Sequence, residues 1–112
     1  MENLWYKNTP LFISFISFIE ILSYPKLKDG DILVIKNFLN KFSKIYINDD
    51  ISELAAELKR RYNLKIGDAI IAATAIYYKQ ILVTKDITDF KKVKEIQLLD
   101  FLNKRFLKIN DF

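Results

Sequence analysis

The stretch from Leu64 to Ile76, which reads LKIGDAIIAATAI, decides the fold of this chain. Asp68 follows a glycine and precedes a run of small and apolar residues. This composition predicts a helix from Asp68 to about Lys79 that is covered on nearly every side. A carboxylate at the head of a buried helix costs free energy unless it caps the helix or meets a partner. Asp68 is therefore the first candidate functional residue.

Short apolar runs and helical patterns alternate on both sides of this helix. Apolar runs predict strands at 11–14, 45–47, 81–84 and 96–99. The capping box Ser17-x-x-Glu20 predicts a helix that ends at Ser23 or Tyr24. Further helices are expected to begin at Asp29 and at Asp50 or Ser52. We also expect a helical turn at 90–94 and a last helix from Asp100 through Lys108. The alternation indicates one α/β domain over residues 1–112, a three-layer sandwich with a mainly parallel sheet.

The composition limits the chemistry that the chain can perform. It contains no cysteine and no histidine, which excludes disulfides, thiolate zinc sites and the commonest general base. Any metal site must be built from oxygen ligands, which favour Mg²⁺, Mn²⁺ or Ca²⁺. The net charge of +4 is compatible with a polyanionic partner. The apolar run at 11–19 is too short to span a membrane, so we expect a cytoplasmic protein.

Four acidic residues occupy comparable places in the predicted architecture: Glu20, Asp68, Asp86 and Asp89. Ligand sites of parallel sheets lie beyond the carboxyl ends of the strands. Carboxylates gathered there can hold a divalent cation that activates water for phosphodiester hydrolysis. Each acid also has a purely structural explanation. Glu20 fits the capping box, Asp68 a helix cap or dipole partner, Asp86 a solvated loop, and Asp89 a cap for the next turn.

Three stretches together resemble the PIN domain family, and within it the VapC-type toxins of prokaryotic toxin–antitoxin pairs. They read ISFISFIEIL at 13–22, DAIIAATA at 68–75, and ILVTKD at 81–86 followed by Asp89-Phe90. The resemblance implies an endoribonuclease that depends on Mg²⁺ or Mn²⁺. Glu20, Asp68 and Asp86 match the second, third and fourth metal-site acids of the family, and Asp89 matches an auxiliary one. It also implies RNA as the substrate and an antitoxin protein as a partner.

The basic residues nearest the expected cleft are candidates for RNA contacts. They are Lys85, Lys91, Lys92 and Lys94. A solvated basic surface explains the same four residues.

Nothing in this sequence matches the first strand of the family, which ends in Asp-Thr-Asn or Asp-Ser-Asn. The resemblance therefore implies a PIN-like fold truncated at its N-terminus, with three carboxylates and a weakened metal site. The missing strand is central in the family, so its neighbours would expose unpaired edges, and we expect a homodimer or higher oligomer. An impaired nuclease, an inactive module that binds RNA or protein, and a reading frame that begins upstream all stay open.

Overall fold

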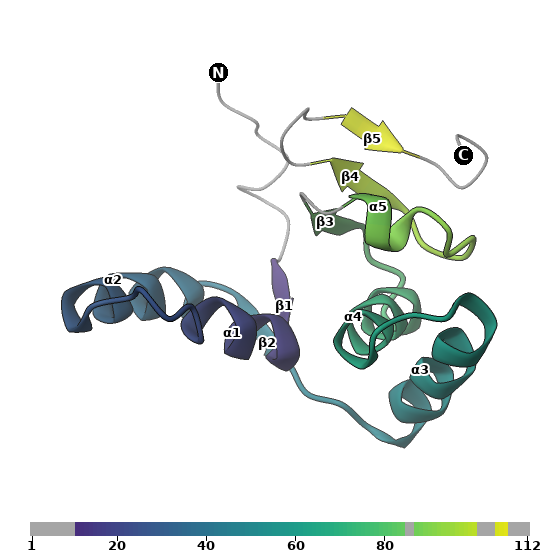
Figure 1. Cartoon of the computed structure of the whole chain (residues 1–112), viewed down its shortest axis with the longest axis horizontal. Helices are drawn as coiled ribbons and strands as arrows, with labels where there is room; N and C mark the ends of the chain where they lie inside the picture. Colours follow the sequence, from purple (N-terminus) through teal and green to yellow (C-terminus); the bar gives the residue numbers. More distant parts are fainter. Residues whose placement is uncertain (1–10, 85–86, 101–104, 108–112) are drawn as a thin grey trace. The chain divides into compact units, whose positions relative to one another are not determined.

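The computed structural model describes residues 11–84, 87–100 and 105–107, which fall into two compact units. The first unit is Met1–Tyr46 and the second is Ile47–Phe112. Figure 1 shows the elements of each unit, which are described separately below.

The first unit contains two helices and a pair of parallel strands. In chain order they are β1 (Phe12–Ser14), α1 (Phe15–Leu22), α2 (Asp29–Leu39) and β2 (Ser43–Ile45). The strand predicted at 11–14 is confirmed as β1, whereas β2 lies two residues before its predicted position. Helix α1 contacts both α2 and the strand pair. Leu39 of α2 is the one fully buried apolar side chain among the described residues of this unit.

Helix α1 begins at Phe15, so the prediction that it begins at Ser17 is wrong. The hydroxyl of Ser14, three residues before the predicted cap Ser17, accepts a hydrogen bond from the backbone N–H of Ile16 at 3.2 Å and caps the helix. Glu20 consequently lies in the second turn, and its explanation as half of a capping box is excluded. The predicted end of the helix is confirmed, since Ser23 is its C-cap.

The second unit contains three helices and three strands. In chain order they are α3 (Asp49–Tyr62), α4 (Ile66–Tyr77), β3 (Leu82–Thr84), α5 (Ile87–Phe90), β4 (Leu98–Asp100) and β5 (Arg105–Leu107). Helices α3 and α4 pack side by side (Figure 1). The core of the unit lies on their facing sides and includes Ile51, Leu58 and Ala72, none of which is exposed to solvent.

Helix α3 follows its sequence pattern closely. The side chain of Asn48 accepts a hydrogen bond from the N–H of Ile51 at 2.8 Å, so the helix begins just before the predicted Asp50 or Ser52. It ends at Tyr62 because Asn63 adopts a left-handed conformation with φ of 55°. Its acidic first turn and basic last turn both complement the helix dipole.

The strands of the second unit pair in the order β3-β4-β5. Strands β3 and β4 are parallel, whereas β4 and β5 are antiparallel. The predicted helix from Asp100 through Lys108 is therefore wrong, because Asp100 ends β4 and Arg105–Leu107 forms β5. Only four positions separate β4 from β5 in the sequence, a spacing that favours antiparallel pairing, because a parallel crossover needs a dozen or more residues.

The observed elements confirm the predicted α/β class and its preference for parallel pairing. Among the described strands, β1 and β2 form one sheet and β3, β4 and β5 form another. No helix in the described ranges is long and apolar enough to cross a membrane.

Candidate metal and nucleic-acid site

Asp68 lies in the first turn of α4, at the third position after the N-cap residue Lys65. The helix begins two residues before the prediction, so Asp68 is not the N-cap, but it does lie where a carboxylate meets the positive end of the helix dipole. Its side chain is half-buried. The predicted covering of α4 is confirmed over most of its length, since Ala69 and Ile71–Ala75 are buried.

The helical period places Asp68 at the head of the buried face of α4. Residues three, four and seven positions further along the same face are Ile71, Ala72 and Ala75, and all three are buried. The hydroxyl of Thr74, a buried polar residue of α4, is satisfied by donating to the Ile70 carbonyl at 2.7 Å. Asp68 is therefore the charged group at the end of an otherwise apolar packing face.

An apolar groove of about 270 Å³ lies on a different side of α4, between it and α3. Its lining includes Ala55 and Ala56 from α3, and Ile66, Ala69 and Ile70 from α4. Asp68 does not line this groove, and no carboxylate does. The groove thus lacks the donors that a divalent cation requires.

The remaining predicted acids occupy different elements. Glu20 is exposed in α1 of the first unit. Asp89 is exposed inside α5, so the expectation that it caps the following turn is wrong. Asp86 comes two residues after the end of β3 in the sequence and lies outside the described residues. Within the residues that the structure describes, no three acidic side chains form a group that could hold a metal ion.

Three of the four predicted RNA-contacting lysines lie on the segment between α5 and β4. Lys91, Lys92 and Lys94 are exposed, and Lys85 lies outside the described residues. The same segment is held against the core by two buried apolar side chains, Val93 and Ile96, which are 0% and 2% exposed. Burial of Val93 and Ile96 therefore leaves the three lysines between α5 and β4 facing solvent.

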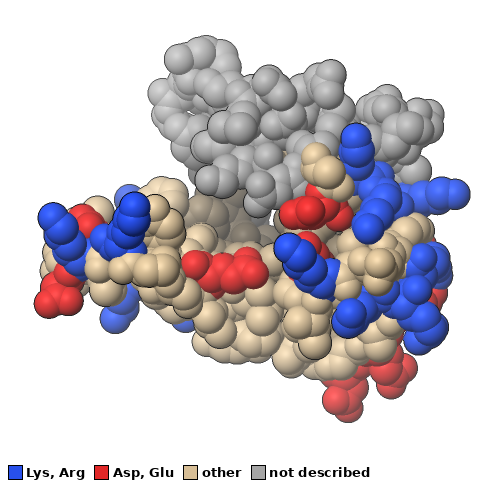
Figure 2. Space-filling model, viewed as in Figure 1, with Lys and Arg blue, Asp and Glu red and all other residues tan. Residues whose placement is uncertain are grey.

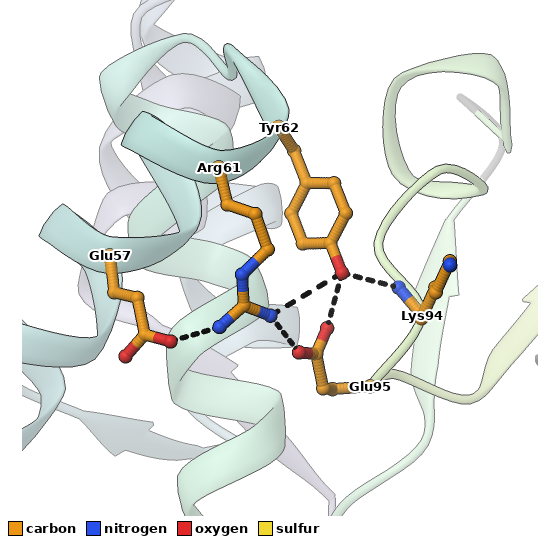
Figure 3. A network of polar contacts seen from close by, with 5 residues as sticks. All are labelled: Glu57, Arg61, Tyr62, Lys94 and Glu95. Atoms are coloured by element: carbon orange, nitrogen blue, oxygen red, sulfur yellow. Dashed lines mark hydrogen bonds and ion pairs between the residues drawn. The ribbon is translucent and has the colours of Figure 1, made fainter.

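A polar network fastens this lysine segment to the end of α3 (Figure 3). The Tyr62 hydroxyl donates to the Glu95 carboxylate at 2.9 Å, and it accepts from the backbone N–H of Lys94 at 3.4 Å. Arg61 forms ion pairs with Glu95 and with Glu57 of its own helix. The contacts of Arg61 and Tyr62 with Glu95 join residues more than thirty positions apart in the chain.

The network shifts the titration of its charged members. Partial burial acts to raise the pKa of Glu95, but hydrogen bonds from Tyr62, from its own backbone N–H and from Arg61 together hold that pKa below its ordinary value. Hydrogen bonds to Tyr62 and Glu95 raise the pKa of Arg61. Sequence patterns miss this network because only the pair Glu57 and Arg61, four residues apart on α3, leaves a local signal.

A family model described as the PIN domain matches residues 2–96 of this chain. The chain belongs to the PIN domain family. Its match includes Glu20, Asp68, Asp86 and Asp89, the four acids singled out from the sequence.

A curated ribonuclease matches part of this chain. The chain is 34% identical over 61 residues to ribonuclease VapC6 of Methanocaldococcus jannaschii. That alignment covers 54% of this chain, and the chain spans only 40% of the length of VapC6.

Solved structures resemble the fold of this chain over most of its length. A toxin–antitoxin complex from Klebsiella pneumoniae gives a TM-score of 0.69 at 32% identity, and the match covers 81% of this chain and 76% of the other. VapBC2 from Rickettsia felis, bound to a DNA fragment from its promoter, gives a TM-score of 0.74 at 26% identity, and the match covers 85% of this chain and 77% of the other. VapBC-1 from nontypeable Haemophilus influenzae shares the fold, with a TM-score of 0.71 at 20% identity and the same two shares covered.

Proposed function

We propose that this chain is a VapC-like endoribonuclease of a toxin–antitoxin pair, acting in the cytoplasm. The membership of the PIN domain family over residues 2–96 carries this proposal. The half-buried carboxylate of Asp68, at the head of the buried face of α4, supports it further.

The proposed metal ligands are Glu20, Asp68 and Asp86, with Asp89 as an auxiliary ligand. All are hard oxygen donors, and the chain offers no thiolate or imidazole that would select a softer metal. Mg²⁺ or Mn²⁺ held on these carboxylates would activate a water and neutralise charge on the scissile phosphate. Three principal carboxylates are few, so we expect weaker metal binding and slower cleavage than a four-carboxylate site would give.

The protein's own groups perform the remaining steps. Carboxylates accept hydrogen bonds from the attacking water and orient it toward phosphorus. Exposed lysines of the segment 91–94 hold the RNA by its phosphates, since phosphate contacts position a nucleic acid without reading its sequence.

Replacement of Asp68 tests this proposal. We expect Asp68→Asn to reduce the cleavage of single-stranded RNA by at least about a hundredfold, because the isosteric amide removes a metal-binding charge. Asp50→Asn is the matched control, since Asp50 is an exposed acid in the first turn of α3. Initial rates of cleavage of a labelled RNA are measured with Mn²⁺ and again with a chelator. Full activity of Asp68→Asn, or cleavage that survives the chelator, would refute the nuclease proposal; RNA binding without any cleavage would favour an inactive RNA-binding module.

The proposed partners are an antitoxin protein and a second copy of the chain. Structural likeness to toxin–antitoxin complexes supports the antitoxin. Helix α2 also exposes the large apolar side chains of Leu33, Val34 and Phe38, which are suited to burial against another protein. Light scattering tests self-association directly, and a strictly monomeric chain at high micromolar concentration would count against the homo-oligomer.

A further inference from the structure

The network at the end of α3 has no place in the metal site, yet it ends on the segment that carries the proposed RNA-binding lysines. Glu95 and the backbone of Lys94 are its two contacts with that segment. Figure 3 shows the backbone nitrogen of Lys94 directed at Tyr62 while its side chain extends away from the network. The contact therefore fixes the backbone and leaves the ammonium group available.

The network is surrounded by basic side chains, which suit the binding of a polyanion. The last turn of α3 carries Lys59, Arg60 and Arg61, and the linked segment carries Lys91, Lys92 and Lys94. Basic side chains gather at the right of Figure 2, over the region where α3 and α5 lie. Glu57 and Glu95 neutralise Arg61, whereas the exposed side chain of Arg60 has no such pair among the contacts of the described residues.

We infer that Tyr62, Arg61 and Glu95 are positioning residues, which hold the segment 91–94 and the end of α3 as one preformed surface for the RNA sugar-phosphate backbone. This inference rests on the proposed function, because RNA is the polyanion in question. A surface that is ordered before binding loses less conformational entropy when RNA arrives. Arg60 extends the surface beyond the lysines that the sequence pattern predicts.

Two substitutions with the same charge separate positioning from simple electrostatics. Glu95→Gln and Glu57→Gln each neutralise one carboxylate that is paired with Arg61. The two carboxylates are similarly exposed, at 38% for Glu95 and 45% for Glu57. Of these two carboxylates, only that of Glu95 lies on the lysine segment and links it to α3. If charge alone matters, both variants bind RNA more tightly than the wild type, because each makes the protein more basic.

Positioning predicts opposite results for the two variants. We expect Glu95→Gln to bind a single-stranded RNA oligonucleotide about three- to tenfold more weakly than the wild type. For Glu95→Gln, the slope of log Kd against the logarithm of the salt concentration should be smaller by about one, because a phosphate contact is lost. Glu57→Gln should bind as the wild type does or slightly more tightly. Tyr62→Phe, which changes no charge, should also bind more weakly and should lose hydrogen-exchange protection at the Lys94 amide.

The measurement is fluorescence anisotropy of the full chain with labelled RNA in the presence of a chelator, at several salt concentrations. Thermal melting of each variant establishes that it is folded. Equal affinities of Glu95→Gln and Glu57→Gln, with RNA binding by the wild type intact, would overturn the positioning role and leave the nuclease proposal standing. A wild type that binds no RNA would overturn both. Wild-type binding with the predicted difference, but without cleavage in Mn²⁺, would leave only the positioning role.

Discussion

Asp68 lies at the N-terminal end of a helix and is also partly buried, whereas an acid that only complements the helix dipole can stay exposed. Its place in the first turn of α4 gains about 0.3–1 kcal/mol from the helix dipole. Its half-buried side chain, on the face that leads to Ala72 and Ala75, adds a desolvation cost that an exposed acid such as Asp50 avoids. A cation shared with other carboxylates would offset part of that cost, so the position of Asp68 agrees with the functional proposal, which the membership of the PIN domain family carries.

Glu95 makes the stability of the second unit depend on pH in the acidic range. Its pKa is lowered in the folded state, so its contribution is fully present above the ordinary glutamate value of 4.5 and is lost as the pH falls through the folded value. We expect the free energy of unfolding of the wild type to fall toward that of Glu95→Gln below pH 4.5. Denaturant titrations of both proteins from pH 7 to pH 3 measure this, and a difference that stays constant would contradict it.

At the level of elements, the position of the cap on α1 is testable by two single substitutions. Ser14→Ala removes the hydroxyl that accepts from Ile16 and should lower the free energy of unfolding by about 1 kcal/mol. Ser17→Ala removes a hydroxyl inside the helix and should change it by less than about 0.5 kcal/mol. Denaturant unfolding measures both, and a larger loss for Ser17→Ala would restore the helix start that the capping-box pattern predicts.

The elements that the sequence predicts well are those with strong local signals. Helix α3 has a regular apolar stripe, and α4 is small and apolar throughout, so both are predicted to within about two residues. Strand β5 is missed because Arg105–Leu107 carries no strand signal of its own and is defined by its pairing with β4. The Ser17-Glu20 pattern misleads because a serine three residues earlier caps the helix instead.

Over the whole molecule, the sequence predicts the family and the candidate acids but not the contacts that connect distant segments. Glu20, Asp68 and Asp86 are identified through their resemblance to PIN-domain motifs, in a chain with no histidine or cysteine to compete with them. The link from Tyr62 to Glu95 joins residues 33 positions apart, and no local pattern encodes such a pairing. The proposed metal ligands likewise come from distant parts of the sequence, since Glu20 and Asp68 lie 48 positions apart in the chain.

The central claim is that Glu20, Asp68 and Asp86 share one divalent cation. Crystals of the protein grown or soaked with Mn²⁺ test it most directly, by anomalous diffraction at the manganese absorption edge. We expect one strong anomalous peak within coordination distance of oxygens from all three carboxylates, and its loss in crystals of Asp68→Asn. Carboxylates that lie on separate faces, or a manganese peak that is retained when Asp68 is replaced, would contradict the claim.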